Sequence, residues 1–194
     1  MSRTPPLVWG LLCAGVIGVS FAGAILQHLS EIPPLMRASW RLQLTSLMLL
    51  PMAIWQYNSM DQESKNSLTE RKTLLILLGS GIALAAHFGT WVTSLDHTTL
   101  AHSLLFVTSH PLLIIAGIAL WYRRPHRLET IGAIIGLTGA CITLLDVQSD
   151  GEVTLYGDFL AFIGAVAVVG YIVAGKVLRS WMPIFVYAFP VTAL

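Results

Sequence analysis

The feature that most constrains this chain is a series of apolar runs, each bounded by a short polar link. A helix needs about 20 mainly apolar residues to cross the hydrocarbon core of a bilayer, and most of these runs reach that length. Charged residues gather in the links and make up 11% of the chain, whereas soluble domains carry roughly a quarter. Because so few charges cannot cover a water-facing surface, we expect an integral, multi-pass membrane protein in contact with the lipid bilayer.

The spacing of the runs predicts an all-α, polytopic transmembrane bundle of about seven hydrophobic segments. Six complete spans are expected at about 7–26, 34–57, 73–95, 100–122, 130–145 and 156–177, followed by the start of a seventh at 182–194. The segment 58–72 carries six charges without apolar periodicity and is predicted to be a linker. Membrane helices usually close with charged or aromatic anchors, and the seventh stretch stops without them. We therefore expect a sequence truncated within that span.

Basic residues in short loops mark the cytoplasmic side of a membrane protein. An N-terminus inside the cell would put nine Lys and Arg residues on the inner side and none in the outer links around His28, Asp96 and Asp150. The nine are Arg3, Lys65, Arg71, Lys72, Arg123, Arg124, Arg127, Lys176 and Arg179. The sequence therefore predicts a cytoplasmic N-terminus, with the cell membrane as the expected location.

The sixth span matches the first when it is shifted by 147 residues. Gly10 then falls on Gly157 and Ala14 on Ala161, and in each copy a proline-containing link opens the next span. Five spans per copy would invert the second copy, and inverted repeats around a midplane site are a plan of secondary transporters. We predict a first five-helix repeat over residues 1–150 and the start of a second over 151–194.

Several short stretches resemble EamA-type members of the drug/metabolite transporter superfamily. They are Arg41 before an apolar second span, 94–101 leading to Pro111, Ile131-Gly132-Ala133 with Gly139-Ala140, and Gly157-Asp158 with a later Tyr171. Many members carry an acidic residue after the fourth span, where this chain has Arg123-Arg124-Pro125. The resemblance implies ten spans in two inverted repeats, and transport of small organic metabolites, often outward.

Ionisable residues inside a span are candidates for function, because burying them in lipid is costly. Arg37 and Arg41 are four residues apart and share one face of the second helix. We expect Arg37, near the outer boundary, to extend to the headgroups. Arg41 lies one turn deeper and either does the same or faces the pathway, where its guanidinium would attract a carboxylate or phosphate.

Two further helical faces carry polar and aromatic residues that could line a pathway. His87, Trp91 and Ser94 share a face of the third span, and Ser103 and His110 share one in the fourth. The histidines could couple a proton to transport, or they could only bond helices together. Tyr171 joins the candidates from the second repeat. The predicted pathway residues are Arg41, His87, Trp91, Ser94, Ser103, His110 and Tyr171.

Pro111 lies within the fourth span, where its missing N–H frees the carbonyl of Val107. The sequence predicts a kink there, which could be a hinge or could fit the helix to its neighbours.

The leading hypothesis is a secondary transporter that exports small organic metabolites and uses no cofactor. There is no phosphate-binding loop, no metal-ligand spacing and no catalytic motif, and the net charge of +1 gives no sign of nucleic-acid binding. The alternative is a non-transporting membrane adaptor or an inactive fragment. A chain that ended at Leu194 would need a second copy to enclose a pathway, so a homodimer is considered.

Overall fold

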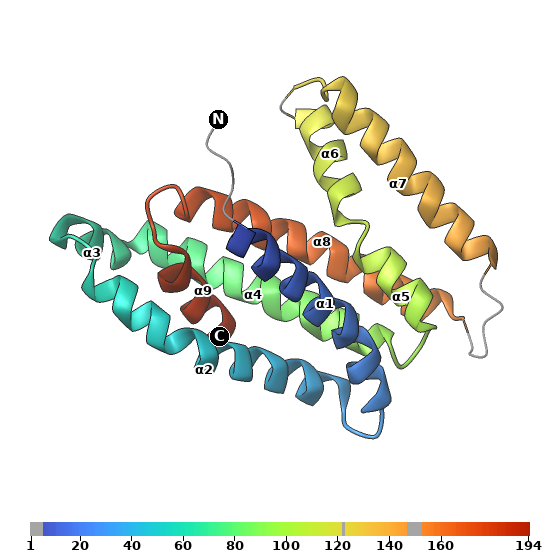
Figure 1. The fold of residues 1–194 in the computed structure, drawn as a ribbon, viewed down its shortest axis with the longest axis horizontal. Helices are drawn as coiled ribbons and strands as arrows, with labels where there is room; N and C mark the ends of the chain where they lie inside the picture. Colours follow the sequence, from blue (N-terminus) through green and yellow to red (C-terminus); the bar gives the residue numbers. More distant parts are fainter. Residues whose placement is uncertain (1–5, 122, 147–152) are drawn as a thin grey trace.

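The structure is a computed structural model that describes residues 6–121, 123–146 and 153–194. Its described part is helical and contains no strand, as the sequence predicts (Figure 1). Arg3, Tyr122 and the acidic link around Asp150 lie outside these residues. The helices are α1 (Pro6–His28), α2 (Pro34–Asn58), α3 (Gln62–Leu68), α4 (Arg71–Ser94), α5 (Leu100–Val107), α6 (His110–Trp121), α7 (Arg127–Asp146), α8 (Leu155–Leu178) and α9 (Ile184–Ala193).

Helices α4 and α8 form the centre of the bundle and make the most extensive helix–helix contact (Figure 1). The face of α8 that meets α4 is built from small residues, with Gly157, Ala161, Gly164 and Ala165 all buried. Small residues let two helix backbones approach closely, which is how helices pack where lipid removes the hydrophobic driving force. Helix α9 completes the bundle by packing against α2 and α4.

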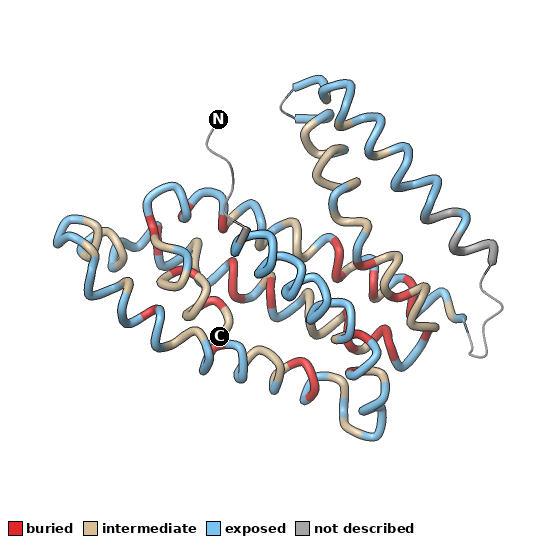
Figure 2. Tube along the Cα trace, viewed as in Figure 1, coloured by how far each residue is buried: buried red, intermediate tan, exposed pale blue. Residues whose placement is uncertain are grey.

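Buried residues concentrate along α4, α5 and α8, while α1 and α7 are largely exposed (Figure 2). An apolar helix with an exposed surface is expected where lipid surrounds the protein. Four helical stretches are long and apolar enough to cross a membrane: Leu7–His28, Arg71–Ser94, Leu100–Trp121 and Leu155–Leu178. The predicted second and fifth spans form helices, α2 and α7, but they are not among these four, so the expected number of seven segments stays a prediction.

Three of the helix–helix links have the same length and backbone pattern. Residues 29–33, 95–99 and 179–183 each make a turn of five residues that ends in an extended residue before the next helix. That extended residue is Pro33, Thr99 or Pro183, with ψ of 135°, 154° and 146°. The first and third links correspond at an offset of 150 residues, which pairs Pro33 with Pro183. The offset of 147 that pairs Gly10 with Gly157 in the preceding helices therefore does not continue through the turn.

The fourth predicted span is broken into α5 and α6 beside Pro111. The carbonyl of Val107, which the proline leaves without its helical N–H, accepts a hydrogen bond from His110 Nδ1 at 3.2 Å. The predicted kink is therefore confirmed, and the side chain of His110 occupies the freed carbonyl.

The predicted linker 58–72 is not a plain connection, because it contains helix α3. Asp61 caps this helix by accepting a hydrogen bond from Ser64 N at 2.8 Å, which also lowers the pKa of its carboxyl below the usual value. No sequence pattern indicated this two-turn helix, because a helix this short is stabilised by its cap and shows no apolar periodicity.

A bidentate ion pair closes the link between α6 and α7. Arg123 donates to the Glu129 carboxylate at 2.9 and 2.7 Å, and the His126 amide donates at 2.6 Å. These donors stabilise the ionised form and hold the pKa of Glu129 at about 2. Glu129 thus brings a carboxylate to the basic stretch that follows the fourth span.

Candidate functional site

Arg41 is the centre of an aromatic cluster inside the bundle. Its guanidinium carbon lies 4.7 Å from the ring centre of Phe88 and 5.4 Å from that of Trp91. His87 stacks on Trp91 with ring centres 6.1 Å apart and planes 20° apart. Residues His87, Phe88 and Trp91 come from consecutive turns of α4, and Arg41 reaches them from α2. We call Arg41, His87, Phe88 and Trp91 the Arg41 cluster.

Two hydrogen-bond donors of this cluster have no acceptor in the described part of the chain. They are Arg41 Nη1 and Trp91 Nε1, and both atoms are buried. The Trp91 side chain is almost fully enclosed, with its residue only 6% exposed. A buried donor without a partner costs about 1–3 kcal/mol, and such groups are rare in native proteins.

The two candidate histidines are each held by a backbone carbonyl through Nδ1. His87 Nδ1 lies 2.8 Å from Gly164 O on α8, and His110 Nδ1 lies 3.2 Å from Val107 O. A carbonyl can only accept, so Nδ1 carries the proton in both rings. Gly164 permits the first contact because a Cβ there would lie 3.3 Å from His87 O.

The third and fourth predicted spans meet at Ser94 and Ser103. Their hydroxyl oxygens are 2.6 Å apart and both residues are fully buried. Ser94 donates to the Trp91 carbonyl at 2.6 Å, so Ser103 is the donor to Ser94. This pair joins α4 to α5 one turn beyond Trp91.

Tyr171 lies apart from the Arg41 cluster. It stacks on Tyr187 of α9, with ring centres 6.0 Å apart, and its carbonyl accepts from the Tyr187 hydroxyl at 3.3 Å. With Lys176 and Arg179 it lines a cavity of about 440 Å³ near the end of α8. The structure therefore gathers Arg41, His87 and Trp91, and leaves Tyr171 at a different level of the bundle.

The expectation that Arg37 extends to the headgroups is wrong. Arg37 is only 2% exposed. It forms an ion pair with Asp96 of the α4–α5 link and donates to the Leu26 carbonyl at the end of α1. The pairing neutralises the charge within the protein, so the side chain has no need to reach the lipid–water boundary.

A second charged group, Asp158, belongs to the stretches that carry the family resemblance and was not predicted to be a site residue. The Asp158 carboxylate, in the first turn of α8, accepts from Thr98 Oγ1 at 2.8 Å and from His102 Nδ1 at 3.1 Å. Thr154 Oγ1 also donates to the His97 carbonyl. Asp158 is an ionisable residue inside a predicted span, and that signal alone could have identified it. Phe88 could have been found from its position three residues before Trp91.

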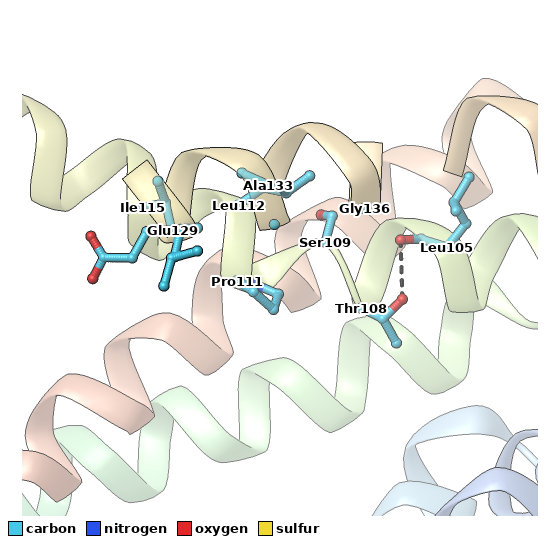
Figure 3. Close-up of a pocket in the computed structure, with 11 residues that line it drawn as sticks. Leu105, Thr108, Ser109, Pro111, Leu112, Ile115, Glu129, Ala133 and Gly136 are labelled. Atoms are coloured by element: carbon cyan, nitrogen blue, oxygen red, sulfur yellow. Dashed lines mark hydrogen bonds between the residues drawn. The ribbon is translucent and has the colours of Figure 1, made fainter. Parts of the chain in front are cut away.

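The break beside Pro111 opens on a cleft of about 510 Å³ between α5–α6 and α7. Figure 3 shows Ser109 and Leu112 on one side of it, with Ala133 and Gly136 of α7 on the other. Thr108 Oγ1 donates back to the Leu105 carbonyl at 3.4 Å. Helix α7 contacts mainly α5 and α6 and diverges from the central bundle (Figure 1).

A second groove, of about 440 Å³, runs between α1 and α2 beside Arg41. Its wall is apolar except for Arg37, Arg41 and Thr45. Among the described residues, no group of three or more His, Cys, Asp and Glu side chains is arranged to hold a metal ion.

Comparison with known proteins gives one match. The sequence model of the EamA-like transporter family matches residues 6–145. No curated protein and no solved structure matches the chain.

Proposed function

Since the chain belongs to the EamA-like transporter family, we propose that it is a secondary transporter that exports small organic metabolites, with the Arg41 cluster on the substrate pathway. The family makes it an integral, multi-pass membrane protein of transporter type. Coupling to a gradient or to downhill flux supplies the driving force, because the sequence holds no phosphate-binding loop.

The observation that carries the assignment is the unneutralised arginine of the Arg41 cluster. Arg37, one turn away, has Asp96, whereas Arg41 forms no ion pair with any described residue. A charge inside a bilayer costs at least about 2.5 kcal/mol and persists where it serves a substrate or ion path. His87 and Trp91 extend this polar path along α4, and the break at Pro111 supplies the candidate hinge.

We expect Arg41→Ala and His87→Ala each to reduce export at least tenfold, because each removes a group that contacts the passing solute or holds its neighbours. His110→Ala is expected to reduce it less, since that ring also serves the Val107 carbonyl. The measurement is mass spectrometry of metabolites that accumulate outside bacterial cells expressing the full chain, compared with cells that carry the empty vector.

The matched controls are Arg71→Ala and His126→Ala, which change an exposed arginine and an exposed histidine. Both should export at the wild-type rate at equal membrane abundance. Export that survived Arg41→Ala, His87→Ala and His110→Ala would show that the pathway lies elsewhere. If no metabolite differed from the empty vector, the adaptor alternative would replace the transporter.

The proposed orientation places the N-terminus in the cytoplasm. It is supported by the nine basic residues that this orientation gathers on the inner side. On a cysteine-free background, Ser30→Cys should react with a membrane-impermeant maleimide added to intact cells, and Ser67→Cys should react only after the cells are opened. Labelling of position 67 in intact cells would reverse the orientation.

The proposed domain organisation is a five-helix repeat over 1–150 followed by the start of an inverted second repeat. The matching links 29–33 and 179–183, each followed by a helix that begins after a proline, support it. A homodimer would be detected as a mass of two chains in native mass spectrometry.

A further inference from the structure

We propose that the Arg41 cluster binds the carboxylate of a small organic anion whose remaining body is apolar. The inference rests on the proposed function, because it names the class of solute that the pathway takes. It is carried by three independent observations, which concern charge, hydrogen bonding and the shape of the adjoining groove.

The first observation is electrostatic. Arg41 is half-buried on α2, and its guanidinium faces two aromatic rings in place of a carboxylate. Those rings provide a face for the cation, worth about 0.5–2 kcal/mol, and they bring no negative charge. A ligand with one negative charge would neutralise the site as Asp96 neutralises Arg37.

The second observation is the pair of donors that lack acceptors. Arg41 Nη1 and Trp91 Nε1 are both buried, and neither has an acceptor among the described residues; the guanidinium carbon lies 5.4 Å from the centre of the indole ring. Neither group can accept, so only an acceptor can satisfy them. A carboxylate oxygen is such an acceptor, and the charge-assisted bond it would form with the guanidinium is about twice as strong as a neutral one.

The third observation is the groove between α1 and α2. Arg41 lies on its wall, and most of the other lining side chains are apolar. They are Gly18, Ala22, Ile25, Leu26, Leu29, Trp40, Leu44 and Met48. If a solute carried several hydroxyl or amine groups, those groups would find no hydrogen-bond partners in this apolar groove, which disfavours sugars and polyamines. The groove fits a hydrocarbon or a single ring attached to the carboxylate.

The test is isothermal titration of the purified full chain in detergent with 4-phenylbutyrate. Its neutral counterpart, 4-phenylbutyramide, keeps the shape and removes the charge. We expect the acid to bind at least tenfold more tightly than the amide. Arg41→Gln should weaken binding of the acid at least tenfold, and Arg71→Gln, an exposed arginine, should leave it unchanged.

Trp91→Phe gives a second variant that keeps an aromatic ring and removes only the N–H. Because that N–H has no partner in the described chain, the variant should be as thermally stable as the wild type without ligand, yet bind the acid severalfold more weakly. If the role of Trp91 were purely structural, the variant would be less stable than the wild type and its affinity for the acid would be unchanged.

Transport separates the two proposals. Binding of 4-phenylbutyrate that depends on Arg41, without counterflow in proteoliposomes, would keep the carboxylate site and overturn the transport assignment. Arg41-independent binding, equal affinity for acid and amide, or binding of oleate but not of 4-phenylbutyrate would each overturn the small-carboxylate site, whatever other solute is exported.

Discussion

Replacing Asp96 with alanine is expected to lower the free energy of unfolding by about 3–5 kcal/mol, because it leaves the guanidinium of Arg37 buried without its counter-charge. For a chain of this length that corresponds to a fall of roughly 6–20 °C in the melting temperature. Arg37 also joins α2 to the Leu26 carbonyl of α1, so the loss should loosen the end of the bundle where α1, α2 and the α4–α5 link meet. The measurement is thermal unfolding of the purified protein in detergent, followed by intrinsic tryptophan fluorescence.

The control for this prediction is Glu31→Ala, which removes an exposed carboxylate in the α1–α2 link. It should change the melting temperature by no more than 1–2 °C, as expected for a surface substitution of within about 0.5 kcal/mol. A double variant, Arg37→Met with Asp96→Ala, removes both charges and should recover part of the lost stability, since apolar replacement of a buried pair is often neutral. Equal stability of Asp96→Ala and Glu31→Ala would show that the ion pair does not hold the bundle together.

Replacing Gly157 with alanine is expected to cost about 3 kcal/mol, at the upper end of the range for overpacking. A Cβ at this position would lie 2.7 Å from the backbone carbon and oxygen of His97 and from Thr98 Cβ. Backbone atoms cannot turn aside as a side chain can, so α8 and the α4–α5 link would have to separate. That separation would strain the bonds from Thr98 to Asp158 and from Thr154 to the His97 carbonyl.

Gly10 is the matched control, because it is the residue that the internal alignment pairs with Gly157. Nothing lies within 4 Å of a Cβ built at Gly10. Gly10→Ala should therefore be neutral or slightly stabilising, by up to about 1 kcal/mol from helix propensity. The comparison uses the same melting measurement, and a Gly157→Ala protein as stable as Gly10→Ala would contradict the close contact between α8 and the link.

Much of the helical fold could be predicted from local pattern. Apolar runs located the long helices, and Pro111 located the break in the fourth span, because both signals act within one or two turns of the chain. The shared face of His87 and Trp91 follows from helical spacing, and the short link after α4 brings Ser94 against Ser103. Whether these residues line a pathway stays a prediction.

The pairing between distant residues could not be predicted in the same way. Arg37 and Asp96 are 59 residues apart, and Gly164 is 77 residues from its donor His87. Their contacts depend on the rotation of each helix about its own axis, which hydropathy does not fix when a helix is apolar on all sides. Because Arg37 lies near a predicted membrane boundary, its side chain was expected to extend to the lipid headgroups. Its partner in the structure is instead the Asp96 carboxylate on a neighbouring link.

The separation of Arg37 from Asp96 has a consequence for synthesis in the cell. The ribosome adds Arg37 to the chain 59 residues before Asp96, an interval of roughly 3–12 s at 5–20 residues per second. During that time the arginine lacks the counter-charge that Asp96 supplies in the folded protein, which opposes entry of the predicted second span into lipid. Stable insertion of α2 therefore waits for α4 and its following link, so the first three long helices should leave the translocon as one unit.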